Sequence, residues 1–276
     1  MIERQTDISG AMVFWTLQPT PLQAIKEVLE YAGFGGCVPN PRTDQSALHN
    51  SIKDVYGTKD KVIVSHKKPK RNGVELVDIQ RDVAVNSYVT NFCAKVVDDV
   101  VKTEYGYADD YKLTEEFLKH KAVLTSGAVG QALSAVIAKM DGMKGFDRSG
   151  VYYVPEHWLA RWKEIATAVE GCREGNRITT VRTVMDADAA RAIRDVLTKE
   201  VQEQASQLLD DVSKGTLNEN RLNVRAQQAQ ELVCRIDLYS NILGEGLEGL
   251  KNVAMLAKSA AAAAVMQDFA SAGVCA

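Results

Sequence analysis

The sequence has few of the residues that mark specialised protein classes. Its 276 residues include five cysteines, six prolines and four histidines, and aromatic residues make up 7%. The cysteines are scattered and odd in number, so they indicate neither a disulfide framework nor a zinc knuckle. Reduced thiols fit a reducing compartment, and we expect a cytoplasmic protein.

Long hydrophobic runs and an excess of positive charge are also missing. The most apolar segment, 253–276, is interrupted by Lys258 and Asp268, and its longest uncharged stretch is far shorter than the ~20 residues of a membrane span. The N-terminus is acidic where a secretory signal would be apolar. Lys and Arg number 33 against 36 Asp and Glu, which excludes a broadly basic nucleic-acid-binding protein. With 46% hydrophobic residues, the composition predicts a soluble, folded chain.

The spacings of common catalytic and metal sites are absent. No pair of histidines has the spacing of a helical zinc site, and no nucleophile elbow, Walker loop or kinase signature occurs. Asp110-Tyr111-Lys112 has the acid-x-Lys spacing of a metal-dependent nuclease strand, but nothing around it confirms that site. Gly244–Gly249 matches the dinucleotide pattern G-x-G-x-x-G, yet we expect a helix to run through it. We therefore predict no catalytic residues, metal or cofactor, with a site assembled from distant residues as an alternative.

Helical patterns alternate with short β-prone runs in the first two thirds of the chain. Met12–Leu17 predicts a strand, and Thr20 with Pro21 predicts the start of a helix that ends at Gly33. A second helix is expected over 44–55 and a third over 114–140.

A small antiparallel sheet with a basic hairpin tip is predicted between the second and third helices. Asn72-Gly73 lies between two β-prone runs, 62–65 and 74–79, and this dipeptide is a strong hairpin signal. A third strand is expected to end near Val97. The tip contains the densest positive cluster of the chain: Lys67, Lys68, Lys70 and Arg71.

This basic tip has two interpretations. Four cations can contact the phosphates of a nucleic acid or an acidic partner. They can equally form a solvated turn, because a run of charge alone is weak evidence. No aromatic residue is interleaved with them, which argues against a platform for stacked bases.

A β-α-β unit is predicted over residues 150–185. Its helix follows Pro155 and carries Trp158 and Trp162 one turn apart. Aromatic side chains at this spacing can line a pocket, but they more often pack in the core, which is our interpretation.

The last third predicts a long antiparallel coiled-coil hairpin of two helices. Its second helix shows a heptad-like three-four step, which forms the expected helical seam. The seam residues are Leu232, Ile236, Tyr239, Leu243, Leu250 and Val253. We thus expect an α+β protein with a mixed body at 1–185 and a helical arm with an Ala-rich tail at 186–276.

Several segments resemble a family of uncharacterised proteins carried by phages and mobile elements. The resemblance rests on Phe14-Trp15, Ala47-Leu48, residues 150–155, residues 235–239 and Leu243-Gly244. It implies a shared mixed α/β body with a helical arm, and it implies no activity or catalytic residue.

The leading functional hypothesis is a non-enzymatic interaction protein. It would act as an accessory or inhibitory factor that forms homo-oligomers or docks a partner through the helical seam, because exposed heptads need a partner. The alternative is a nucleic-acid-associated factor whose basic tip contacts phosphates.

Overall fold

The structure analysed is a computed structural model, and its contacts divide the chain into two compact units. The first unit contains 1–14, 137–162 and 179–276, and the second contains 15–136 and 163–178. The units therefore divide the chain differently from the expected body at 1–185 and arm at 186–276. The structure describes the following residues: 8–59, 61–68, 71–81, 86–144, 150–184, 186–214, 219–244 and 246–272.

A four-stranded sheet lies in the first unit. Its order is β10-β1-β9-β8, and β1 pairs antiparallel with β9, with Gly10 opposite Pro155. The predicted β-α-β elements are present, but β1 lies between their two strands. The strands are β1 (Ile8–Thr16), β8 (Met143–Lys144), β9 (Tyr152–Pro155) and β10 (Arg177–Val184).

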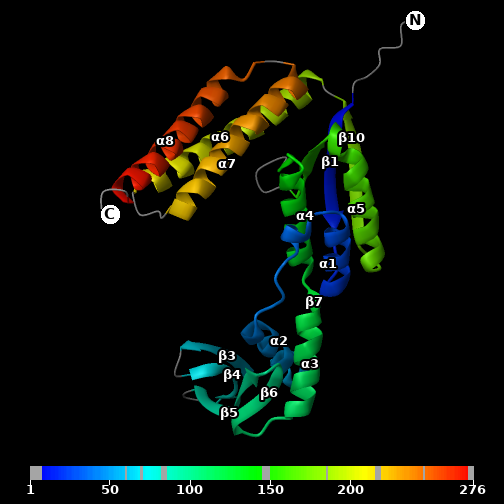
Figure 1. Ribbon diagram of the computed structural model, residues 1–276. Helices are drawn as coiled ribbons and strands as arrows, with labels where there is room; N and C mark the ends of the chain where they lie inside the picture. The colour runs from blue at the N-terminus through cyan, green and yellow to red at the C-terminus, as the bar shows by residue number, and fades with distance from the viewer. Residues whose placement is uncertain are drawn as a thin grey trace, which may run out of the picture. The chain divides into compact units, whose positions relative to one another are not determined.

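Three long helices complete this unit, where the sequence predicted two. They are α6 (Ala187–Ser213), α7 (Glu219–Leu243) and α8 (Glu248–Ala272). Helix α8 packs against both α6 and α7 (Figure 1). The predicted continuous helix through Gly244–Gly249 was wrong: α7 ends at Leu243, and Gly244 adopts a φ of 64°, a left-handed conformation that ends helices. The Ala-rich segment continues α8.

The core of the first unit joins the three helices to the sheet. Tyr153 from β9 lies in one buried cluster with Leu197 of α6, Ile236 of α7 and Ala257 of α8. A hydrophobic face on each helix is thus covered by the chain itself. No described helix is long and apolar enough to cross a membrane.

The second unit contains a meander of four antiparallel strands, one more than predicted. The order is β3 (Lys61–Lys68), β4 (Arg71–Arg81), β5 (Asn86–Val97) and β6 (Val100–Gly106). The unpredicted β6 follows a tight turn in which Asp98 and Asp99 have positive φ.

Two helices cover one face of this meander. They are α2 (Asp44–Tyr56) and α3 (Asp110–Ala122), and each begins with a side-chain cap, from Thr43 and Asp109 respectively. Leu48 and Phe117 from the helices are buried with Leu76 and Phe92 of the sheet.

The rest of this unit consists of short elements and three more helices. The expected helix 114–140 is interrupted: α3 ends at Ala122 and a new helix starts at Ser126. Thr20 does not cap the first helix, since its hydroxyl donates to the Gln18 carbonyl. The elements are β2 (Thr20–Pro21), α1 (Leu22–Tyr31), η1 (Gly35–Cys37), β7 (Val123–Leu124) and α4 (Ser126–Lys139). After β9, the first unit also contains η2 (Glu156–Trp158) and the start of α5 (Leu159–Cys172), which continues into the second unit. Elements β1, α4, α5 and β10 contribute residues to both units.

Candidate functional site

The basic tip lies where the sequence placed it, between β3 and β4. The strands extend further than predicted, because Lys68 pairs with Arg71 and Lys67 with Asn72. Asn72 and Gly73 are therefore strand residues and not the turn itself. Lys70 and the side chains of Lys67, Lys68 and Arg71 lie outside the described residues.

The residues of the predicted helical seam are buried or partly buried within the chain. Leu232, Ile236 and Tyr239 on α7 are buried in the core of the first unit. Leu243, Leu250 and Val253 pack against the same cluster and are partly buried. The seam residues of α7 and α8 therefore pack together in the core of one chain.

Two seam-side residues of α7 also hold the loop before β8. The Tyr239 hydroxyl donates to the Asp141 carbonyl at 2.7 Å, and the Arg235 guanidinium donates to the Gly142 carbonyl at 2.9 Å. Arg235 also pairs with Glu200 of α6 at 2.8 Å. Burial raises the pKa of the Tyr239 phenol well above its ordinary value. We call Arg235 and Tyr239 the loop clamp.

The loop held by the clamp leaves no room for larger side chains. Asp141 has a φ of 54°, and a Cβ on residue 142 would collide with Ile137 and the Tyr153 carbonyl. The sequence predicted a seam role for Tyr239 and gave Arg235 only as part of a resemblance. Their spacing of four puts both polar groups on one helix face, which was the available signal.

The outward face of α8 is the most unusual surface in the first unit. Met255, Leu256 and Met266 have 42, 66 and 73% of their surface exposed. The remaining exposed positions along this face are small or uncharged: Asn252, Ser259, Ala262 and Ala263. The opposite face buries Ala254, Ala257 and Ala261, as expected for a helix with one side in the core. Lys258 lies partly buried between the two faces.

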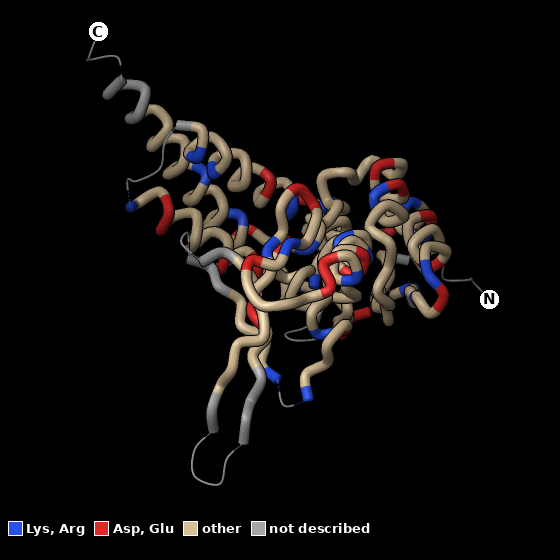
Figure 2. The backbone as a smooth tube through the Cα atoms, turned by 90° about the horizontal axis from the view of Figure 1, so that it is seen from below, with Lys and Arg blue, Asp and Glu red and all other residues tan. Residues whose placement is uncertain are grey.

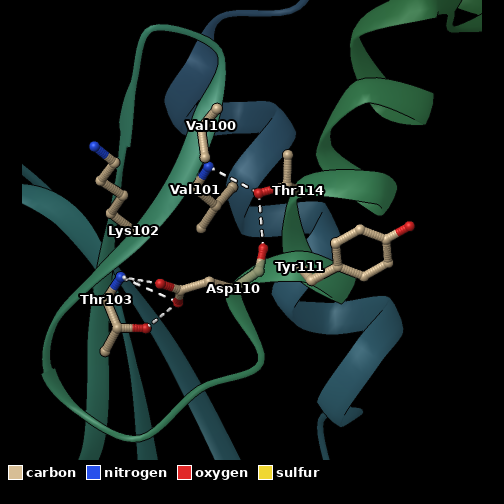
Figure 3. A pocket seen from close by; sticks show the side chains of 7 residues that line it. All are labelled: Val100, Val101, Lys102, Thr103, Asp110, Tyr111 and Thr114. Atoms are coloured by element: carbon tan, nitrogen blue, oxygen red, sulfur yellow. Dashed lines mark hydrogen bonds between the residues drawn. The ribbon is translucent and has the colours of Figure 1, made fainter.

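A pocket of about 450 Å³ lies between β6 and the start of α3 (Figure 3). The Asp110 carboxylate accepts hydrogen bonds from the Thr103 backbone N–H and hydroxyl. The Thr114 hydroxyl accepts from the Val101 N–H at 3.0 Å and donates to the Asp110 carbonyl at 2.7 Å. Asp110 thus anchors a helix to a strand, and Asp110-Tyr111-Lys112 is a first helical turn, not a nuclease strand.

The other residues that the sequence singled out pack or hydrogen-bond within the fold. Trp162 is buried and its indole N–H donates to the Thr180 hydroxyl at 3.3 Å, so the core interpretation holds for it. His120 contacts Asp54 at 2.8 Å and Arg42 at 3.3 Å. Within the described ranges, no three His, Cys, Asp or Glu side chains converge closely enough to hold a metal ion.

Comparison with protein families gives one match. The family of unknown function DUF6744 matches residues 10–268. The chain belongs to the DUF6744 family. The matched residues lie in both units. No curated protein and no solved structure matches the chain.

Proposed function

We propose that this DUF6744 protein is a non-enzymatic interaction protein that self-associates through the outward face of α8. The supporting observation is the run of exposed, uncharged side chains from Asn252 to Met266, which includes two methionines and a leucine. Exposed apolar faces of this length mark interaction sites in monomeric proteins.

The pattern of large and small residues favours a second copy as the partner. In an antiparallel pair centred on Ser259, Leu256 lies opposite Ala262, and Met255 lies opposite Ala263. These two large side chains then meet alanines, which lets the helices approach closely. The outward face has no charged residue between Asn252 and Met266, so like charges do not meet across such a pair.

The length of the face sets the expected strength of the contact. Residues 252–266 span about 22 Å along the helix at 1.5 Å per residue. A single helix pair of this length lies at the lower end of specific interface sizes, so we expect a dissociation constant in the micromolar range.

This proposal moves the interface from the predicted seam to the opposite side of α8. Leu232, Ile236 and Tyr239 are occupied inside the chain and their exposure would require unfolding. We further propose an accessory or inhibitory role in phages or mobile elements and a cytoplasmic location. These rest on the sequence resemblance and the scattered cysteines.

Sedimentation velocity over a concentration series tests the proposal. Leu256→Glu places a charge at the centre of the face and is expected to leave a monomer at every concentration. The matched control is Val224→Glu, which changes an apolar residue of α7 that is 53% exposed. Dimerisation equal in both variants, or no dimer in the unsubstituted protein, would overturn the proposal.

A further inference from the structure

The two edge strands of the second unit's sheet differ in whether α3 supplies hydrogen-bond partners to their outward backbone groups. Along the β6 edge, the backbone N–H groups of Val101 and Thr103 donate to the Thr114 hydroxyl and the Asp110 carboxylate of α3. Two outward donors of this edge are thereby satisfied, as Figure 3 shows. Covering an edge in this way prevents another strand from pairing with it.

The opposite edge is formed by β3. In the described part of the chain, β3 has a strand neighbour on one side only, which is β4. Helix α2 contacts β3, β4 and β5 alike, so it crosses the face of the sheet and does not lie along its edge.

The pairing register identifies which backbone groups face outward from β3. Residues of an antiparallel strand point their N–H and C=O groups alternately to either side. The backbone groups of Val101 and Thr103 point away from β5, so those of Lys102 point toward its partner Lys95 on β5. By the same alternation, the backbone of Ala94 on β5 points toward its partner Val74 on β4. One residue further along β4, the backbone of Glu75 points toward its partner Val64 on β3.

Val64 therefore points its backbone toward β4, and its neighbours Ile63 and Ser65 point theirs outward. The Lys61 N–H, also on the outward side, donates to the Thr58 carbonyl at 3.4 Å in the preceding turn, in agreement with this phase. The free edge thus offers the backbone groups of Ile63 and Ser65 at its centre.

Charge decides between possible occupants of this edge. Strand β3 contains Lys61, Lys67 and Lys68 and no acidic residue. Antiparallel pairing with a second copy, centred on Val64 so that Ile63 lies opposite Ser65, would place Lys61 opposite Lys67. Like charges directly opposite one another destabilise a strand pair. An acidic strand has the complementary charge.

We propose that the free edge of β3 binds an extended acidic segment of a partner protein by strand addition. Backbone hydrogen bonds to Ile63 and Ser65 supply the pairing, and the net positive charge of the β3 sequence favours a segment with carboxylates. Val62 and Val64 lie on the sheet face that α2 does not cover, and they favour apolar residues at alternate positions of the segment. This surface lies in the second unit and is independent of the self-association through α8.

The test uses a labelled peptide, Glu-Glu-Val-Thr-Val-Thr-Val-Glu-Glu, whose sequence reads the same in both directions. Fluorescence anisotropy is expected to show saturable binding to the full chain. The same peptide with Lys in place of every Glu is expected not to bind. Amide hydrogen exchange should slow at Ile63 and Ser65 when the Glu peptide binds, because both N–H groups then have partners.

Two substitutions at one position separate strand pairing from charge attraction. Ser65→Pro removes an outward N–H without removing a bond to β4, and proline is tolerated on edge strands. Ser65→Ala keeps that N–H and also loses the side-chain contact with His49. We expect Ser65→Pro to weaken peptide binding at least about tenfold and Ser65→Ala to change it less than about twofold.

Circular dichroism melting curves establish that both variants fold. Equal peptide affinity of the two folded variants would overturn the proposal, as would absence of binding to the unsubstituted protein. Binding of an unlabelled single-stranded oligothymidylate, with a steep salt dependence and no binding of the peptide, would instead make this a nucleic-acid surface and would also overturn it.

Discussion

Helices α7 and α8 are each 25 residues long and pack against each other, yet their outward faces differ. The exposed positions of α7 are mostly polar, as in the pair Gln227–Glu231, where the two side chains hydrogen-bond at 3.0 Å. The outward face of α8 has no charge between Asn252 and Met266. Figure 2 shows Lys, Arg, Asp and Glu interspersed along helices of the chain.

The difference shows that packing alone does not explain the composition of α8. A helix that only completes the core needs one apolar stripe, which Ala254, Ala257 and Ala261 already supply. Solvent favours polar residues on the other side, as α7 demonstrates. The second apolar face of α8 therefore points to contact with another molecule.

The largest expected effect on stability follows the loss of a buried side chain of α7. Ile236→Ala on α7 should lower the free energy of unfolding by about 2–5 kcal/mol, because it removes a buried side chain and leaves a cavity. Leu256→Ala on the outward face of α8 should change it by less than about 0.5 kcal/mol at a concentration where the protein is monomeric. Urea denaturation followed by circular dichroism measures both. A large loss for Leu256→Ala would mean that this face packs within the chain.

The next effect concerns the loop that α7 holds. Gly142→Ala should destabilise the protein by about 1–3 kcal/mol, because the added methyl group collides with Ile137 and the Tyr153 carbonyl. Gly249→Ala is the control, since a Cβ there meets nothing within 4 Å and lies in the first turn of α8. Thermal melting compares the two variants. Equal melting temperatures would show that the loop can move aside.

A smaller loss is expected when the clamp loses one hydrogen bond. Tyr239→Phe leaves the partly buried Asp141 carbonyl without this donor and should cost about 1–2 kcal/mol. Tyr107→Phe is the matched control, because that ring is 90% exposed. Denaturant titrations at neutral pH give the difference, and no loss for Tyr239→Phe would remove the clamp from the account.

The smallest effect is a change in alkaline pH dependence. Burial holds the pKa of Tyr239 above its unfolded value of 10.0, so the native state keeps its proton while the unfolded state loses it. Stability should be unaffected below pH 9 and fall as the pH rises through and above 10. Tyr239→Phe should make this fall shallower in stability curves measured from pH 8 to 11. An unchanged slope would contradict the buried position of the phenol.

The sequence predicted much of the local structure because patterning reports burial within an element. The seam positions Leu232, Ile236 and Tyr239 do lie on one buried face. The three-four step indicates that one helix face is covered. It does not identify what covers the face, because a helix of the same chain and a second chain produce the same pattern. The break at Gly244 was missed because the apolar step continues across it.

The second unit illustrates a different limit of pattern reading. Strand β6 was missed although Lys102 and Glu104 alternate with Val101, Thr103 and Tyr105, which is the pattern of a half-buried strand. Asp98-Asp99 forms the turn between β5 and β6. The satisfied β6 edge depends on Asp110 and Thr114 of α3, and such long-range hydrogen bonding has no local signature.

Cysteine cross-linking tests the central claim about α8 most directly. In a background in which the exposed Cys234 is replaced by serine, Ser259→Cys places a thiol at the centre of the outward face, and Asn223→Cys places one on exposed α7. Mild oxidation at micromolar protein should give a disulfide-linked dimer from Ser259→Cys much faster than from Asn223→Cys. Equal rates for the two variants, or no dimer from Ser259→Cys, would contradict self-association through this face.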